Sequence, residues 1–399
     1  MRSDKIRLLT FSTLYPNSIR PGHGIFVETR LRELVASGKI ESRVVAPVPW
    51  FFSTHPRYGE YARSALIPRR EMHNGFDVQH PRYFLPPKVG MNMAPFSLAI
   101  GAIGAIQSLL DEGYDFDVID AHYYYPDGVA AAILGRYFKK PFTVTARGSD
   151  INLISTYAFP RMLMQWTSRR AVASIGVSQA LTQAMVNIGM PADSILMMPN
   201  GVDLERFNFQ SQLSAKTTLG WPSGPTLISV GNLVKNKGHH HVIEALVDLP
   251  EFQLFVAGEG PERDALEKLT SQLGVSSRVR FLGRLDQKEL AICLCAADIL
   301  VLASSREGWP NVLLESMACG TPVVATQVGG VPEIVTSPNA GRLMNSQTAA
   351  ATVEAVLDLW AHLPDSAAVR ACALGCSWQR TTDAQLNLFA SIACSMPVP

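Results

Sequence analysis

Ala303-Ser-Ser-Arg-Glu-Gly-Trp-Pro-Asn-Val-Leu-Leu-Glu-Ser-Met-Ala-Cys-Gly-Thr-Pro322 follows the short apolar run Ile299-Leu-Val-Leu-Ala303, and we interpret the rest of the chain around it. A continuous apolar run bounded by polar residues is typical of a strand in a parallel sheet that is covered on both faces. Pro310 and Gly320 predict a helix of about ten residues between them, because proline favours the first helical turn and glycine the position after the last. The stretch therefore predicts a strand, a loop and a short buried helix.

Two carboxylates lie at the edge of this expected helix. Glu307 follows the strand, and Glu315 shares a helix face with Asn311, four residues earlier. An ionised carboxylate in such apolar surroundings costs on the order of several kcal/mol unless it is bonded. Sugar hydroxyls are suitable partners, because they donate hydrogen bonds without adding a charge, and the free N–H groups at the helix start attract phosphate. The spacing alone is equally compatible with a structural role, in which Glu315 pairs with an arginine and Glu307 is a solvated turn residue.

Residues 307–326, Glu-Gly-Trp-Pro-Asn-Val-Leu-Leu-Glu-Ser-Met-Ala-Cys-Gly-Thr-Pro-Val-Val-Ala-Thr, continue into Gly329-Gly-Val-Pro-Glu333. This pattern resembles the signature of glycosyltransferase family 4, whose members are retaining enzymes with the GT-B fold. The resemblance implies that Glu307 contacts the donor sugar and that Glu315 contacts the nucleotide ribose. It also implies donor-site positions for the residues around them, namely Gly308, Trp309, Asn311 and Val312.

Length and composition are those of a globular α/β protein. The chain has 399 residues, of which 17% are charged and 47% hydrophobic, so two domains with separate cores are expected. The net charge of +1 conceals an asymmetry, because residues 1–200 carry 21 Lys and Arg against 15 Asp and Glu. A basic first half suits an anionic partner such as a membrane surface or a phosphorylated lipid, but this excess is too modest to indicate nucleic acid.

The cysteines and the apolar segments bear on localisation. The six cysteines show no CxxC spacing and several lie in apolar helical surroundings, which predicts reduced, buried thiols in a cytoplasmic protein. The apolar run near the start is too short for a signal peptide and is interpreted as the first strand. Residues 94–110 carry no charge, but 17 residues fall short of the roughly 20 that a membrane span needs. We therefore favour a buried or interfacial helix over a span.

The first domain is expected to begin with a strand at residues 7–11, a loop that contains Gly22 and Gly24, and a helix over residues 25–37. The loop resembles the N-terminal glycine loop of GT-B enzymes, which implies that Gly22 and Gly24 line the donor cleft. Residues 48–88 are rich in proline, arginine and aromatics and are expected to be a long irregular section. Such a section is compatible with peripheral contact at the inner face of a membrane, with a packed loop or with a protein contact.

Polar residues follow two further strands of the first half. The run at residues 116–120 leads to His122 and Tyr123, and the run at residues 141–146 leads to Arg147 and Asp150. Open α/β sheets bind ligands at the carboxyl ends of their strands. His122 alone favours a structural role, but the resemblance implies a catalytic position near the donor sugar and the acceptor, with Tyr123, Arg147 and Asp150 on the acceptor side. Many relatives have His-Gly where this chain has Arg147-Gly148, so we expect the acceptor side to differ.

The second half opens with a strand and a polar loop, residues 226–238. The resemblance implies that Lys237 binds the donor diphosphate and has a catalytic role, whereas Asn232 occupies the position of an arginine. A lone lysine before a glycine would otherwise be expected to face solvent. The resemblance also implies that the main chain near Leu285 contacts the nucleobase.

These observations predict an α/β protein of the GT-B type, with two Rossmann-like domains whose parallel sheets face each other across a cleft. The expected divisions are an acceptor-side domain at 1–205, a nucleotide-sugar-binding domain at 206–378 and a C-terminal helix at 379–399 that crosses back to the first domain. The expected function is retaining hexosyl transfer from a nucleotide diphosphate sugar to a glycan or lipid-linked acceptor in cell-surface polysaccharide or glycolipid synthesis, without a metal or other cofactor. A nucleotide-sugar epimerase of the same fold and a non-catalytic sugar-nucleotide-binding protein remain alternatives.

Overall fold

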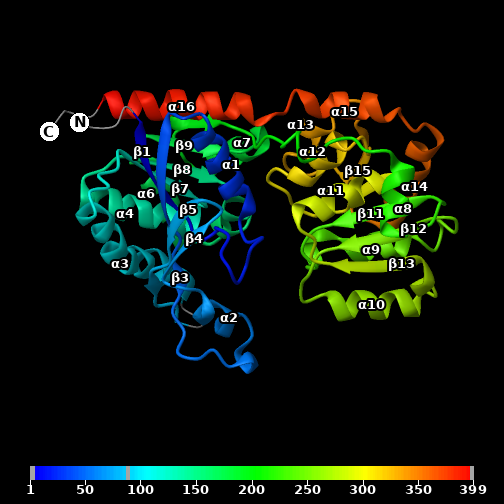
Figure 1. Ribbon diagram of the computed structural model, residues 1–399, viewed down its shortest axis with the longest axis horizontal. Helices are drawn as coiled ribbons and strands as arrows, with labels where there is room; N and C mark the ends of the chain where they lie inside the picture. Colours follow the sequence, from blue (N-terminus) through cyan, green and yellow to red (C-terminus); the bar gives the residue numbers. More distant parts are fainter. Residues whose placement is uncertain (1–4, 87–89, 396–399) are drawn as a thin grey trace. The chain divides into compact units, whose positions relative to one another are not determined.

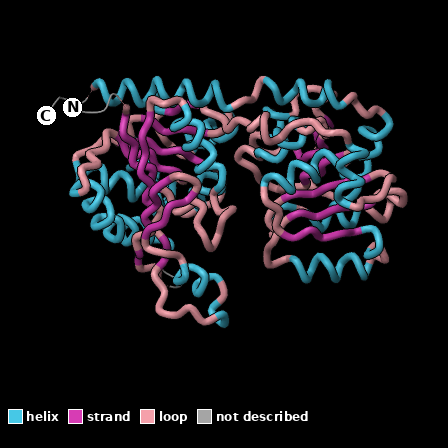
Figure 2. Tube along the Cα trace, viewed as in Figure 1, coloured by secondary structure: helices cyan, strands magenta, loops and turns pink. Residues whose placement is uncertain are grey.

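The computed structural model describes residues 5–86 and 90–395. The chain forms two compact units, one of Met1–Pro199 with Gln379–Pro399 and one of Asn200–Trp378. The first division falls at Pro199, six residues before the expected boundary. In each unit, helices pack around a central sheet (Figures 1 and 2).

The first unit contains an eight-stranded sheet in the order β10-β9-β8-β7-β1-β2-β5-β4, in which only the β4–β5 pair is antiparallel. A separate parallel pair joins β3 to β6. The strands are β1 Ile6–Phe11, β2 Ile40–Val45, β3 Val48–Pro49, β4 Arg70–His73, β5 Phe76–Gln79, β6 Arg82–Tyr83, β7 Val118–His122, β8 Phe142–Ala146, β9 Ala173–Gly176 and β10 Ile195–Met197. The α-helices are α1 Ile25–Ala36, α2 Glu60–Leu66, α3 Gly90–Asp111, α4 Val129–Phe138, α5 Ser149–Asn152, α6 Ala158–Ser168 and α7 Gln179–Asn187, with α16 Trp378–Cys394 returning at the end of the chain.

One expectation for this unit is wrong, and another is confirmed with a difference in length. Residues 48–86 are not irregular, because β3, α2, β4, β5 and β6 all lie within them. Helix α3 has 22 residues, so it is longer than its charge-free sequence suggested, and it is the one described helix that is long and apolar enough to cross a membrane.

The second unit contains a six-stranded, fully parallel sheet in the order β13-β12-β11-β14-β15-β16. Its strands are β11 Thr226–Val230, β12 Gln253–Ala257, β13 Val279–Gly283, β14 Ile299–Leu302, β15 Val323–Thr326 and β16 Gly341–Met344. Its α-helices are α8 Gln212–Leu219, α9 His239–Ala245, α10 Arg263–Gln272, α11 Gln287–Ala296, α12 Asn311–Ala318, α13 Val331–Ile334, α14 Ala349–Ala361 and α15 Ser366–Leu374.

Strand β14 is buried on both faces, as the apolar run predicted. Leu300 and Leu302 belong to one core cluster, whereas Ile299 and Val301 belong to the cluster on the other face, as alternation along a strand requires. The helix that follows is shorter than expected, because α12 has eight residues and Pro310 precedes it.

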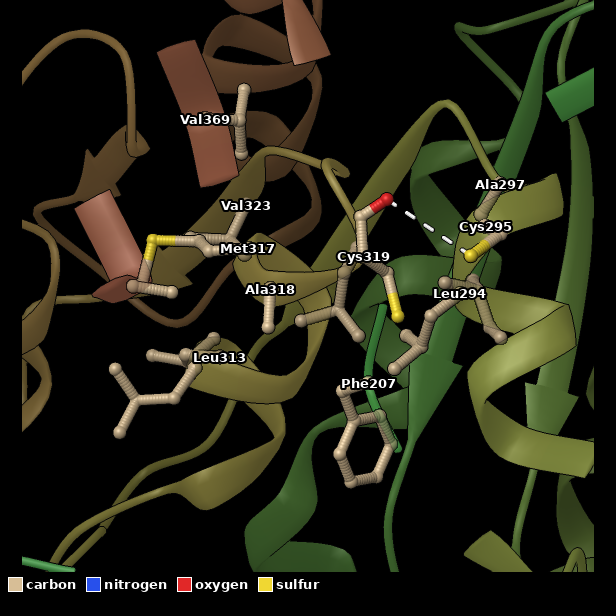
Figure 3. Packing of buried hydrophobic residues seen from close by; sticks show 14 of the residues in the cluster. Phe207, Leu294, Cys295, Ala297, Leu313, Met317, Ala318, Cys319, Val323 and Val369 are labelled. Carbon is tan, nitrogen blue, oxygen red and sulfur yellow. Dashed lines mark hydrogen bonds between the residues drawn. The ribbon is translucent and has the colours of Figure 1, made fainter. Parts of the chain in front are cut away.

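The cysteines are free thiols, but they are not all buried. Cys293, Cys295 and Cys319 are buried in the second unit, Cys372 and Cys376 are half-buried, and Cys394 is exposed. Figure 3 shows Cys295 and Cys319 among the apolar side chains of the core, with the Cys295 thiol 4.0 Å from the Cys319 carbonyl oxygen. The expectation of burial is therefore wrong for Cys394.

Candidate active site

The predicted donor residues of the second unit collect where the strand order reverses. From β11 the chain continues through β12 and β13 on one side, and it then returns to β14, β15 and β16 on the other. Loops that follow the two strands at such a switch point diverge and leave room for a ligand. Lys237 follows β11 and Glu307 follows β14, so both lie at this position.

A close backbone approach fixes the loop that carries Lys237. Gly238 has φ 68°, and a Cβ atom there would lie 1.9 Å from the Ala303 carbonyl oxygen, so only glycine fits. The Ser305 N–H donates a hydrogen bond of 2.8 Å to the Asn236 carbonyl oxygen. The loop after β11 is thereby held against the loop after β14.

This arrangement brings Lys237 and Glu307 together. The Lys237 ammonium lies 2.5 Å from Glu307 Oε1, and the two side chains are 24% and 9% exposed. The sequence predicted separate roles for these residues, with Lys237 on the diphosphate and Glu307 on the sugar, and it did not predict their contact. The pair forms one polar centre that a phosphate and a sugar hydroxyl could share.

Glu315 is half-buried on α12, and the nearby positions of this helix include Leu314 and Met317, which belong to the core cluster. Burial raises the pKa of its carboxyl to about 7, and the nearby Arg206 acts in the opposite direction. Arg206 is itself engaged with Asp203 at 3.7 Å and with Gln287. In the described part of the chain, the Glu315 carboxylate has no ion pair, so the structural alternative of a salt-bridged Glu315 is not found.

The remaining donor-site residues differ in accessibility. Asn232 is exposed, Gly308 is buried, and Leu285 and Val312 are half-buried against the core cluster. Trp309 and Asn311 both bond to Asn200 of the same unit. Trp309 Nε1 donates to the Asn200 carbonyl oxygen at 2.9 Å, and Asn311 Oδ1 accepts from Asn200 Nδ2 at 3.1 Å. Sequence reasoning missed Asn200, because no local pattern connects it to residues more than a hundred positions away.

The first unit also has a switch point, between β1 and β7. Asp127 connects the two sides, because its carboxyl group accepts hydrogen bonds from the Thr13 N–H at 2.7 Å and from the Thr13 and Ser12 hydroxyls. Burial raises the pKa of Asp127 to about 8. Gly24 has φ 67° and packs against the Leu14 backbone, whereas Gly22 is exposed in the same loop. Asp127 therefore holds the start of the loop that contains Gly24, a contact that no local sequence pattern predicts.

His122 is the centre of a buried chain of three side chains. Its Nε2 lies 3.1 Å from Asp120 Oδ2, and its Nδ1 lies 2.7 Å from an Arg147 guanidinium nitrogen. Because arginine only donates, Nδ1 accepts and Nε2–H donates to Asp120. Burial lowers the pKa of His122 to about 4, with Asp120 opposing and Arg147 adding to the effect, so the ring is neutral at pH 7. Asp120 could have been found from the sequence, because residues two apart on a strand face the same side.

These contacts describe the surroundings of His122, and its catalytic role stays a prediction. The side chain is 2% exposed and both of its ring nitrogens are engaged, so it orients Arg147 and does not present a free nitrogen to substrate. Arg147 lies over the Phe26 ring at 5.0 Å, and burial lowers its pKa to about 9. Where many relatives have a histidine before the glycine, this chain therefore has Arg147, whose guanidinium donates a hydrogen bond to His122.

The two other acceptor-side residues have different surroundings. Asp150 is fully buried and accepts backbone hydrogen bonds from Tyr124 at 2.6 Å and Gly148 at 2.7 Å, so it organises the loop and cannot reach an acceptor. Tyr123 is half-buried, and its hydroxyl lies 2.9 Å from the Ser149 hydroxyl. Of the acceptor-side residues predicted from sequence, Tyr123 and Arg147 remain candidates for contact.

Comparison with known proteins assigns this chain to a class. The family described as glycosyl transferases group 1 matches residues 216–368, and the family described as glycosyltransferase family 4 matches residues 22–206. The chain belongs to these GT-B glycosyltransferases and is an enzyme of that class.

Individual relatives agree with the assignment. A putative teichuronic acid biosynthesis glycosyltransferase from Bacillus subtilis, TuaC, is 29% identical over 364 residues, which is 88% of each chain. Sucrose-phosphate synthase from Thermosynechococcus elongatus has a TM-score of 0.78 at 19% identity and covers 98% of this chain and 100% of its own. Anabaena HepE, solved with UDP and glucose, has a TM-score of 0.72 at 18% identity and covers 97% and 100%. The solved structures establish the shared fold, and the epimerase alternative gains no support from these matches.

Proposed function

We propose that this glycosyltransferase moves a hexose from a nucleotide diphosphate sugar to a glycan or lipid-linked acceptor, with retention of anomeric configuration. The observation that carries the proposal is the Lys237–Glu307 pair at the switch point of the second sheet. A cation and a carboxylate at this distance offer one group to a departing diphosphate and one to sugar hydroxyls.

The leaving group needs positive charge around it. The Lys237 ammonium supplies a charge, and the free N–H groups at the start of α12 supply partial charges. Because Asn232 replaces the expected arginine, Lys237 is the side-chain cation of this loop that we assign to the diphosphate. We propose that these groups neutralise the diphosphate without a metal ion.

The two glutamates have separate tasks in this proposal. Glu307 accepts hydrogen bonds from hydroxyls of the transferred sugar, and these bonds strengthen as positive charge develops on the ring. Glu315 accepts from the ribose hydroxyls, whose hydrogen bonds favour the ionised carboxylate that desolvation disfavours. Ligand binding should therefore favour ionisation of Glu315.

The acceptor is assigned to the first unit, with Arg147 and Tyr123 as its contacts. Arg147 suits an acceptor that carries a carboxylate or phosphate, because a guanidinium matches both geometries. The relation to TuaC supports cell-surface polysaccharide synthesis as the setting. The free thiols support a reducing compartment, so we propose a cytoplasmic site of action.

The experiment that tests the proposal is a thermal-shift screen with UDP, GDP and ADP and their hexose derivatives. UDP-glucose comes first, because the HepE structure contains UDP and glucose. A ligand at about 100 times its Kd should stabilise the protein by about 2.7 kcal/mol. The donor found in this way is then incubated with acceptor extracts, and the anomeric configuration of the product is read by NMR. No stabilisation by any nucleotide, or release of an epimerised sugar alone, would contradict the proposal.

A further inference from the structure

The first unit has apolar side chains on its surface that its core does not use. They lie in two places, on the lobe that carries β3 and α2 and on the outer face of the first half of α3. Figure 1 shows α2 near the tip of this lobe, with β3 at its base and α3 nearby. We call the exposed set the apolar face, and its members are Trp50, Phe52, Tyr61, Phe84, Met93, Phe96 and Ile100.

The lobe gathers its aromatic rings into one cluster. Phe51 lies 4.5 Å from Phe52, 5.2 Å from Tyr58 and 5.2 Å from Tyr61 between ring centroids. Phe52 nevertheless remains 67% exposed, and Trp50 is 50% exposed. The cluster is therefore ordered by its own contacts while its outer rings face water, which is unusual for side chains of this size.

Helix α3 has two apolar faces with different surroundings. One face is buried and includes Ala94, Leu98 and Ala102, which follow helical spacing. The other carries Met93, Phe96 and Ile100, which also share a face and are exposed, Ile100 by 72%. Because one face of α3 packs into its own unit, the helix does not resemble a free membrane span. Its exposed apolar face instead suits a position on the surface of a bilayer.

Backbone contacts make the lobe and the helix one continuous surface. The Trp50 N–H donates to the Tyr83 carbonyl oxygen at 2.7 Å, which places Trp50 beside the end of β6. The Ser97 hydroxyl donates to the Phe84 carbonyl oxygen at 2.5 Å. Phe84, which is 62% exposed, therefore lies between Trp50 and the exposed face of α3.

The charges around the apolar face have one predominant sign. Residues 48–86 contain five arginines and three acidic residues. Glu60 is paired with Arg20 at 2.9 Å and with Arg63 at 3.1 Å, and Asp77 is paired with Arg70 at 2.6 Å. Helix α3 has no charged residue before Asp111. Arg57 and Arg69 are exposed, and the Arg57 guanidinium lies 4.6 Å from the centroid of the Tyr58 ring, so an arginine rim meets the aromatic cluster at Arg57.

We propose that the apolar face docks the first unit onto an anionic lipid bilayer. The aromatic rings and the exposed face of α3 enter the interface, and the arginine rim meets the lipid headgroups. The proposal goes beyond sugar transfer, because it concerns where the enzyme is held. A bilayer fits better than a protein partner because the apolar side chains come from a helix and a projecting lobe whose charges favour an anionic plane.

The test is co-sedimentation of the full chain with phosphatidylcholine vesicles and with equimolar phosphatidylcholine–phosphatidylglycerol vesicles. We expect binding to the anionic vesicles and a loss of binding at high salt, because the screening length falls from about 10 Å at 0.1 M to about 3 Å at 1 M. The double variant Phe52→Ser with Ile100→Ser should lower the partition coefficient at least about tenfold, since two exposed apolar side chains are lost. Leu213→Ser is the matched control, because Leu213 is 74% exposed but lies in the second unit.

Three outcomes would overturn the proposal. The first is equal recovery in the supernatant with and without anionic vesicles. The second is a loss of binding in the Leu213→Ser control as large as that in the double variant. The third is a parent protein that does not bind vesicles but forms a concentration-dependent dimer in gel filtration, which the double variant does not form. Nucleotide binding, measured by calorimetry on the same proteins, should be unchanged by the double variant. Vesicle docking and donor binding can therefore fail independently.

Discussion

Glu307→Gln keeps the shape of the side chain and removes the charge that Lys237 contacts at 2.5 Å. Lys237 is 24% exposed, so its ammonium can be rehydrated when the pair is lost. We therefore use the range for accessible ion pairs, about 0.5–1 kcal/mol, and not the larger cost of an isolated buried charge. A loss of this size lowers the Tm by about 1–4 °C for a unit of this length.

The same change should act in opposite directions on binding and turnover. In the ligand-free enzyme Glu307 occupies the Lys237 ammonium, so an incoming diphosphate must compete with it. Removal of the carboxylate should therefore tighten nucleoside diphosphate binding about 2–5-fold, which corresponds to the same 0.5–1 kcal/mol. Turnover should fall at least about 10²-fold, because the bonds from Glu307 to the sugar strengthen only as the transition state forms.

Calorimetry with the nucleoside diphosphate and initial-rate kinetics on the same preparation separate the two effects. Far-ultraviolet circular dichroism and a melting curve confirm that the variant is folded. If Glu307→Gln turns over at the parental rate, the carboxylate does not act on the sugar. If it binds the diphosphate tenfold more weakly, Glu307 serves to position Lys237 and the competition argument is wrong.

Lys237→Ala should lower turnover at least about 10²-fold, and a near-parental rate would show that the diphosphate is bound elsewhere. The separate variant Asn232→Arg should improve donor affinity. Glu315 has a folded-state pKa raised from 4.5 to about 7, so the ligand-free protein should lose on the order of 3 kcal/mol of stability as pH rises from about 4.5 to above 7. Glu315→Gln should flatten this dependence of stability on pH in melting curves, and it should weaken nucleotide binding. An unchanged pH dependence would refute the burial argument. Asp127, whose pKa is raised to about 8, is protonated at pH 7, so Asp127→Asn should cost less than about 1 kcal/mol in urea unfolding and Asp127→Ala about 1–3 kcal/mol, with equal losses counting against the hydrogen-bond account.

The donor half of the site could be predicted because its residues lie in short, local patterns. Strand β14, Glu307 and the helix that carries Glu315 occur within twenty residues, and their spacing follows directly from strand and helix periodicity. The contact between Lys237 and Glu307 could not be predicted in the same way. It depends on the approach of Gly238 to Ala303, which joins loops from two strands that are neighbours in the sheet but distant in the chain.

The acceptor half was predicted less well for a related reason. The sequence predicts His122 and Asp150 as polar residues near the ends of two buried strands, but position alone does not indicate whether they point to solvent or to the protein. Asp150 serves backbone N–H groups, and His122 serves Asp120 and Arg147. The lobe over residues 48–86 was missed because its strands are two to four residues long, too short for an alternating pattern to be recognised.

The return of α16 to the first unit affects how the chain can fold during synthesis. Leu386, Phe389 and Ile392 complete a core cluster with Leu8 and Leu34, and Arg30 donates to Gln385 at 2.7 Å. The second unit is one uninterrupted segment and can fold as soon as it leaves the ribosome, whereas the first unit must wait for α16, which is made after the whole second unit. Until α16 is made, the surface of α1 and β1 that it will cover remains open to chaperones or to aggregation. Separate expression of residues 200–378 is therefore feasible, whereas residues 1–199 alone lack part of their own core.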